Sequence, residues 1–168
     1  MTDISRRKLI ATGIASAAIP NWAAAGAPRE LSWDDLIPPG VPYAEIIGEG
    51  AIDIENDLWN PIYDENAKKL NTALEGALIR MPGYMIPLEL DARGVTEFIL
   101  VPYVGACIHV PPPPPNQLVL VDTPEPWPSD QLWDAVWVTG KMRTGFNSFD
   151  IADTGYTLTA TKMERYEW

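Results

Sequence analysis

The sequence predicts a mainly β protein, built as a small barrel of five strands with one helix before the first strand. After Ala77, apolar and polar residues alternate with a period of two in several segments, as half-buried strands require. Before that point, residues 64–76 carry apolar side chains at helical spacing, between a capping residue and a glycine. Glycines inside the first and fourth predicted strands mark the bends that a small barrel needs.

The N-terminus has the features of a twin-arginine signal peptide over residues 1–25. Arg6 and Arg7 precede an apolar run over 9–19, and three alanines end the segment at Ala25. The run is shorter than the roughly 20 apolar residues that a membrane-spanning helix needs. We therefore expect a periplasmic protein that is exported by the twin-arginine route and cleaved near Ala25.

Composition excludes some classes of function. Removal of residues 1–25 takes away three of the 12 basic and one of the 23 acidic residues, which leaves a formal net charge of −13. A chain this acidic repels a phosphate backbone, so we expect no nucleic-acid binding. No later segment is long and apolar enough to span a membrane. The sequence does not indicate an oligomeric state.

Residues 26–63 form a lead-in that is rich in proline and acidic side chains, and we expect it to be mainly irregular. One helical turn is predicted over 31–37, where Ser32 and Asp35 have the spacing of a capping box. The remainder is expected to wrap around the domain as a loop, held by three aromatic side chains: Tyr43, Trp59 and Tyr63.

The one predicted helix covers 64–76. Asp64 is a suitable N-cap, Gly76 is a natural end, and Glu65 and Lys69 have the spacing of an i,i+4 ion pair. The apolar stripe is expected to pack on the core, and it consists of Ala67, Leu70, Leu74 and Ala77.

Five strands follow, and together they define the barrel domain at 64–168. The first is expected to be kinked at Pro82-Gly83 and the fourth to be bulged or bent at Gly140. Their order resembles that of an OB-like barrel, a fold that hosts many unrelated functions. The predicted strands are 77–90, 95–101, 117–121, 135–143 and 155–166.

The sharpest chemical signal lies between the second and third strands, at residues 101–117. Cys107 is the only cysteine of the chain, and His109 is the only histidine. In an extended chain, residues two apart point to the same side, and the proline at 111 favours an extended backbone before it. The prolines after it form a stiff rod. The loop is therefore expected to hold the two side chains in fixed positions.

Three interpretations of this pair remain open. As metal ligands, the thiolate and imidazole suit zinc or copper, with Glu89, Asp122 or a residue of a second subunit as a further ligand. As a catalytic pair, His109 would activate Cys107 as a thiolate nucleophile or redox centre, although no third orienting group can be identified. Cys107 can also be a small buried side chain without a chemical role, since free cysteine is often buried.

The prolines themselves suggest a binding surface. Polyproline segments dock into aromatic grooves of partner proteins, although such ligands usually lie in disordered tails rather than between two strands. A rigid loop can still be recognised by a partner. The residues expected to contact one are Pro111, Pro112, Pro113, Pro114, Pro115 and Asn116.

With these residues in view, the chain resembles an exported bacterial family called domain of unknown function 3299. The resemblance covers nearly all of the chain after residue 25, and the Cys-x-His-polyproline core is its most specific part. It implies no established activity, and it favours an exported transport or metal-responsive setting. The segments that carry it are 33–38, 82–89, 97–103, 105–117, 136–140 and 155–156.

These observations together predict a periplasmic domain that is not an enzyme. Its 105–117 loop is expected to bind a transition metal, or a partner protein of a transport or envelope system. The alternatives are a thiol-based enzyme or redox protein that uses Cys107, and a structural adaptor that meets its partner through the polyproline segment.

Overall fold

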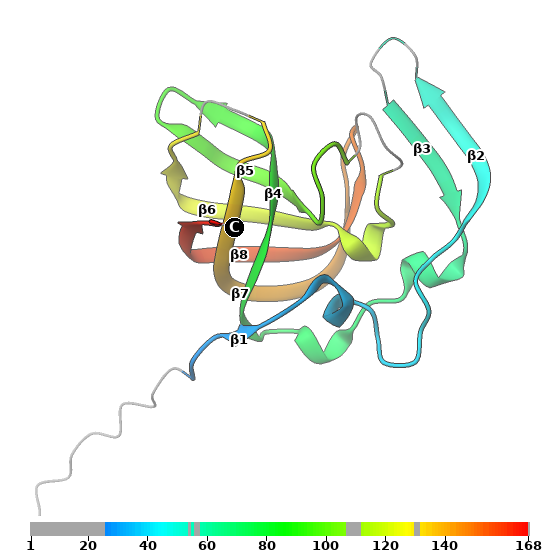
Figure 1. The fold of residues 1–168 in the computed structure, drawn as a ribbon, viewed down its shortest axis with the longest axis horizontal. Coiled ribbons are helices and arrows are strands. Elements are labelled where there is room, and N and C mark those ends of the chain that lie inside the picture. Colours follow the sequence, from blue (N-terminus) through cyan, green and yellow to red (C-terminus); the bar gives the residue numbers. More distant parts are fainter. Residues whose placement is uncertain (1–25, 54, 56–57, 107–111, 130–131, 168) are drawn as a thin grey trace, which may run out of the picture.

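A computed structural model describes residues 26–53, 55, 58–106, 112–129 and 132–167 (Figure 1). The predicted signal peptide, residues 1–25, lies outside the described residues. The described part of the chain contains no helix that is both long enough and apolar enough to cross a membrane.

Five strands close into a barrel, so the predicted mainly β fold and the strand number are confirmed. Their order around the barrel is β4-β5-β6-β8-β7, and antiparallel pairing of β4 with β7 closes it. All neighbouring pairs are antiparallel except β6 and β8, which run parallel. A two-residue strand, β1 (Arg29–Glu30), adds in parallel to β4. The barrel strands are β4 (Leu78–Asp91), β5 (Gly94–Val101), β6 (Val119–Trp127), β7 (Ala135–Ser148) and β8 (Asp153–Arg165).

Gly140 provides the bend that the sequence predicts in the fourth barrel strand. The register between β7 and β8 shifts between Thr139 and Gly140. A side chain at Gly140 would overlap the carbonyl oxygen of Thr159 on β8, so only glycine allows the two backbones to approach this closely.

The single helix predicted over 64–76 is wrong. Two short 3-10 helices, η2 (Glu65–Lys68) and η3 (Thr72–Leu74), occupy this segment, and the backbone of Lys69 is extended between them. Asp64 does cap η2, and Asn71 caps η3 by accepting a hydrogen bond from the Ala73 N–H. Asparagine side chains compete with the helical ladder in this way, which explains why the helix does not continue.

The lead-in contains more regular structure than expected. Its first helical turn is η1 (Trp33–Leu36), and the two residues of the predicted capping box are bonded, since the Ser32 N–H and hydroxyl both donate to the Asp35 carboxylate. Those hydrogen bonds from Ser32 lower the pKa of Asp35. The predicted loop is replaced by a hairpin of β2 (Ile46–Asp53) and β3 (Leu58–Tyr63), which projects beyond the barrel (Figure 1).

The core fills the barrel and extends under the lead-in. Its main cluster joins Leu31 and Leu36 of the lead-in to barrel side chains such as Phe98 and Tyr156. The Tyr156 hydroxyl donates to the Leu36 carbonyl at 2.5 Å and accepts from the Asn71 N–H at 2.6 Å. One buried side chain thus ties η1 and the start of η3 to β8, and its burial raises the pKa of Tyr156 to about 12.

Candidate functional site

The segment between β5 and β6 carries most of the residues that the sequence singles out. It ends in a short 3-10 helix, η4 (Pro115–Gln117), just before β6. Residues 107–111 lie outside the described part of the chain, and they include Cys107, His109 and Pro111. The arrangement of the two predicted metal ligands therefore stays a prediction.

The described prolines of this segment face mainly inward. Pro112, Pro113 and Pro114 are buried, whereas Pro115 is partly exposed. Asn116, another predicted contact residue, is only 1% exposed. On the described side of the loop, a partner would therefore meet Pro115 before the other prolines.

Hydrogen bonds from the side chains of Tyr63 and Asn116 fix the described end of the loop. The Tyr63 hydroxyl of β3 donates to the Pro112 carbonyl, in line with the predicted role of Tyr63 in holding the lead-in. The Asn116 amide donates to the Asn66 carbonyl at 2.9 Å and to the Lys69 carbonyl at 3.1 Å. Proline has no N–H, so these side-chain donors take over the role that backbone donors play elsewhere.

Gln117 extends the same network to the lead-in. Its amide donates to the carbonyls of Trp33, at 3.0 Å, and of Asn116, at 3.1 Å. The loop thereby bonds to β3, to the η2 region and to η1, which are all parts of the chain that precede the barrel. On the other side of the segment, Ala106 is fully buried. Both described flanks of residues 107–111 are therefore held by packing or hydrogen bonds.

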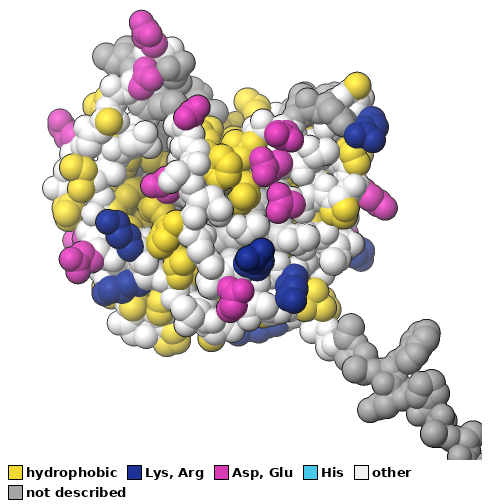
Figure 2. Space-filling view, turned by 180° about the vertical axis from the view of Figure 1, so that it is seen from behind, with side chains coloured by type: hydrophobic (Ala, Val, Ile, Leu, Met, Phe, Trp, Pro, Cys, Tyr) yellow, Lys and Arg dark blue, Asp and Glu magenta, His cyan; other side chains and the backbone are white. Residues whose placement is uncertain are grey.

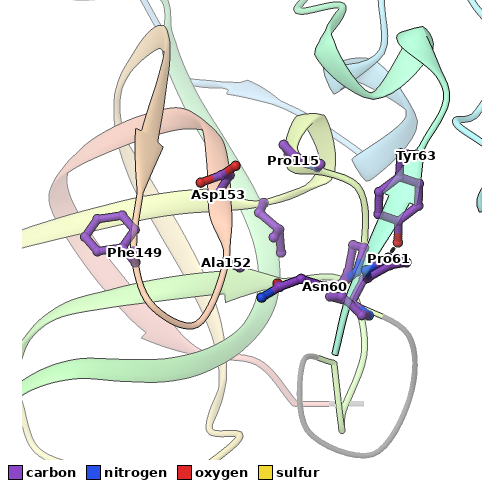
Figure 3. Close-up of a pocket in the computed structure, with 10 residues that line it drawn as sticks. Asn60, Pro61, Tyr63, Pro115, Phe149, Ala152 and Asp153 are labelled. Carbon is purple, nitrogen blue, oxygen red and sulfur yellow. Dashed lines mark hydrogen bonds between the residues drawn. The ribbon is translucent and has the colours of Figure 1, made fainter. Parts of the chain in front are cut away.

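A hollow of about 210 Å³ lies beside the proline segment. Figure 3 shows its walls, which come from β3, from the proline segment and from the turn between β7 and β8. These three segments are far apart in the sequence, so sequence patterns could not indicate the hollow. Its lining residues are Asn60, Pro61, Tyr63, Pro112, Pro113, Pro115, Leu118, Phe149, Ala152 and Asp153.

The lining of this hollow suits binding better than acid–base chemistry. Most of its residues are proline or apolar, and its one ionisable carboxyl group belongs to Asp153. The Tyr63 hydroxyl already donates to the loop. General acid–base catalysis normally uses a pair of groups with different proton affinities, and the described lining offers no such pair.

Glu89 lies away from the described ends of the loop. The loop follows Val101, which pairs with Tyr84 on β4, and Glu89 is five residues further along that strand. At about 3.3 Å per residue, this places Glu89 roughly 15 Å from the start of the loop. Among the described residues, no three His, Cys, Asp or Glu side chains are grouped so that they could hold a metal ion.

The neighbours of Glu89 are carboxylates on the adjacent strands. Glu97 pairs with Glu89 on one side and with Asp122 on the other. Partial burial raises the pKa of Glu97, and the nearby charges of Asp122 and Glu89 raise it further. Protonation of Glu97 therefore favours the folded state.

We expect Glu97→Gln to raise the free energy of unfolding at neutral pH by about 0.5 kcal/mol, the usual scale for a solvent-screened surface site. The contribution of Glu97 is fully present below its ordinary pKa of 4.5 and is lost as the pH rises through the raised pKa. The gain from the substitution should therefore shrink toward pH 4. Urea unfolding of the variant and the wild type between pH 4 and pH 8 measures this gain in stability. Glu125→Gln is the control, because Glu125 is exposed. A larger gain at pH 4 than at pH 8 would contradict this assignment.

Comparison with known proteins places the chain in a family. Residues 33–165 match the family model described as "Protein of unknown function (DUF3299)". The chain belongs to the DUF3299 family. The predicted resemblance is thus confirmed, and the matched span includes the β2–β3 hairpin, the proline segment and all five barrel strands.

A solved structure of another DUF3299 protein is similar over its whole length. It is the crystal structure of a DUF3299 family protein from Pseudomonas aeruginosa PAO1, with 37% sequence identity and a TM-score of 0.66. The alignment covers 85% of this chain and 99% of that chain. No curated protein matches this DUF3299 chain.

Proposed function

We propose that this DUF3299 protein is a non-enzymatic binding domain of the periplasm. Its 105–117 loop binds a soft or borderline transition metal, zinc or copper, through Cys107 and His109. The observation that carries the proposal is the anchoring of the loop: Tyr63 bonds to Pro112, and Asn116 bonds to the η2 region. A loop fixed next to the only cysteine and the only histidine loses little conformational entropy when both side chains bind one ion.

Two protein ligands leave the coordination sphere of the metal incomplete. Structural zinc sites usually have four protein ligands, and catalytic sites have three. Glu89 is a candidate for a third, but the loop would have to reach along β4 to meet it. A ligand atom from a partner protein of the transport or envelope machinery can fill this third coordination position without that movement. Metal binding and partner binding then occur at one site. Of the loop prolines that the structure describes, Pro115 is the most exposed.

We expect Cys107→Ser and His109→Ala each to weaken zinc or copper(I) binding by more than about tenfold. Substitution of a residue that only orients a metal ligand already lowers metal affinity by about that factor. The double variant should lose little more than either single one, because neither residue alone makes a site. Affinity should fall as the pH drops, since thiol and imidazole must each lose a proton to coordinate.

Calorimetric titration of the reduced protein measures these effects. Glu89→Gln serves as a matched variant, and we expect it to bind metal like the wild type because of its distance from the loop. Equal affinities of the wild type and the double variant for both ions would eliminate the metal site. A partner would then have to recognise the loop through the prolines alone.

We also infer that the barrel is an OB-like fold. Numbered within the barrel, the strands follow the order 1-2-3-5-4, with strand 4 closing on strand 1 and strands 3 and 5 parallel. This order supports the inference, because OB folds are five-stranded Greek-key barrels. OB folds bind ligands on the face of strands 2 and 3 and through the loops between strands 1 and 2 and between strands 4 and 5. Here the turn between strands 4 and 5 lines the hollow beside the 105–117 loop, through Phe149 and Ala152.

Location in the periplasm rests on Arg6 and Arg7. If the twin-arginine system exports the chain, replacing both by lysine should abolish the mature form in periplasmic fractions, while the precursor accumulates in the cytoplasm. Immunoblots of fractionated cells measure the two forms. Replacement of Lys8 by arginine serves as a control that keeps the charge and leaves the pair intact. Undiminished export of the double lysine variant would contradict the proposed route.

A further inference from the structure

The β2–β3 hairpin, which we call the arm, exposes several large apolar side chains. Within the described residues, β2 and β3 pair only with each other. A two-stranded ribbon without further cover is marginally stable in water. Yet four isoleucines of the arm are between 42% and 66% exposed: Ile46, Ile47, Ile52 and Ile62.

These isoleucines occupy both faces of the arm. Ile52 lies opposite Trp59, and Ile62 lies opposite Gly48. Residues opposite each other in an antiparallel pair share a face, and Trp59 and Ile62 are three positions apart on one strand, so they point to different faces. A flat partner surface would cover only one of the faces. A groove that receives the arm covers both.

The arm is formed in advance and is not a loose loop. The Trp59 indole N–H donates to the Glu49 carbonyl at 2.5 Å across the two strands. Gly50 has a φ of +65°, and a side chain there would overlap the Asn60 carbonyl. At the base, the Asp64 N–H donates to the Glu45 carbonyl at 2.9 Å. A preformed arm loses little entropy on docking.

Charge distinguishes among the molecules that could cover the arm. From Glu45 to Asp64, the arm with its two flanking residues, the chain has six Asp or Glu residues and no Lys, Arg or His. Figure 2 shows Asp and Glu side chains beside hydrophobic ones on the arm, at the upper left. A second copy of this chain, whose net charge is −11, would bring like charges together. A surface that carries Lys and Arg fits instead.

We propose that the arm docks into an apolar groove, rimmed by Lys and Arg, on a different protein. The isoleucines fill the groove, and the acidic side chains face its basic rim. The base of the arm contacts the 105–117 loop through the bond from Tyr63 to Pro112. The four isoleucines do not line the hollow beside that loop, so the inference does not depend on metal binding there.

Photo-crosslinking from the arm tests the proposal in the native cell envelope. A benzophenone amino acid replaces Ile52 in the full chain, and in the control it replaces Leu132, which is 56% exposed and lies outside the arm. We expect one discrete adduct from position 52 that is absent from position 132. Mass spectrometry identifies the crosslinked protein, which is then purified and titrated with the wild type and with variants.

Three variants show whether the arm itself is recognised. Ile47→Ser/Ile52→Ser/Ile62→Ser should weaken binding by at least about tenfold, whereas Leu132→Ser/Phe146→Ser should not. Because these isoleucines are exposed, the thermal unfolding midpoint of the triple variant should stay near that of the wild type. Glu45→Lys/Glu49→Lys should also weaken binding, and added salt should weaken binding of the wild type.

Each remaining outcome overturns the proposal. An adduct of twice the mass of the chain would assign the arm to a second copy. If positions 52 and 132 gave the same adducts, or if position 52 gave no adduct, the arm would not be a docking surface. An affinity that the serine or lysine substitutions leave unchanged would do the same. Cys107→Ser/His109→Ala should bind the partner like the wild type, which separates this test from that of the metal site.

Discussion

Tyr156→Phe is expected to lower the free energy of unfolding by about 2–4 kcal/mol, because one hydroxyl serves a buried carbonyl and a partly buried N–H of the backbone. It donates to the Leu36 carbonyl and accepts from the Asn71 N–H. The substitution removes a single oxygen atom, so the ring still fills its place in the core. What it leaves behind is a buried carbonyl and a partly buried N–H without these partners. A buried unsatisfied group costs about 1–3 kcal/mol.

Urea denaturation and thermal unfolding measure this loss, which corresponds to about 5–15 °C in the unfolding midpoint for a domain of this size. Tyr43→Phe is the matched control, because the Tyr43 side chain is 48% exposed. A Tyr156→Phe protein as stable as the control would show that the hydroxyl does not hold η1 and η3 on the barrel.

Gly140→Ala is expected to destabilise the barrel by about 3 kcal/mol, at the upper end of overpacking effects. The added methyl group would overlap the Thr159 carbonyl on β8, which is backbone and cannot rotate away. Relief requires the β7–β8 pairing to open at the register shift between Thr139 and Gly140. Hydrogen exchange of the amides on both strands should therefore speed up together.

Gly26→Ala provides the control, since a side chain there would meet no atom within 4 Å. Its stability should match that of the wild type. If Gly140→Ala unfolds at the same urea concentration as Gly26→Ala, the close approach at this bend does not limit the fold.

The barrel could be predicted because its signals are local. Alternation of buried and exposed residues marks much of β7 and β8, continuous apolar runs mark β5 and the start of β6, and Gly140 marks the bend in β7. The capping box of Ser32 and Asp35 also depends only on neighbours in the sequence. Patterns of this kind need no knowledge of tertiary contacts.

The two short 3-10 helices within 64–76 and the arm could not be predicted, because their structure depends on distant contacts and on irregular strand register. The pattern over 64–76 favours a helix, but the Asn71 N–H bonds to Tyr156, 85 residues away, and the Asn71 side chain caps a new turn. In the arm, register shifts around Gly48 break the alternation that would mark a strand. Tertiary contacts and bulges thus override the local signals.

The sequence predicts which segment carries the candidate site, but it does not predict the distant contacts that hold this segment in place. The single cysteine, the single histidine and the prolines draw attention to 101–117. The roles of Asn116 and Gln117 as anchors depend on carbonyls about 50 and 84 residues away. The only local clue is that two amide side chains directly follow a run of prolines, which lack backbone donors.

Elemental analysis of the natively exported protein tests the central claim most directly. The wild type and the Cys107→Ser/His109→Ala variant are purified from the periplasm without chelators and analysed by mass spectrometry for zinc and copper. We predict close to one equivalent of one of these metals per wild-type chain and a background level in the variant. Equal metal content in the two proteins, whether near zero or near one equivalent, would contradict a metal site at Cys107 and His109.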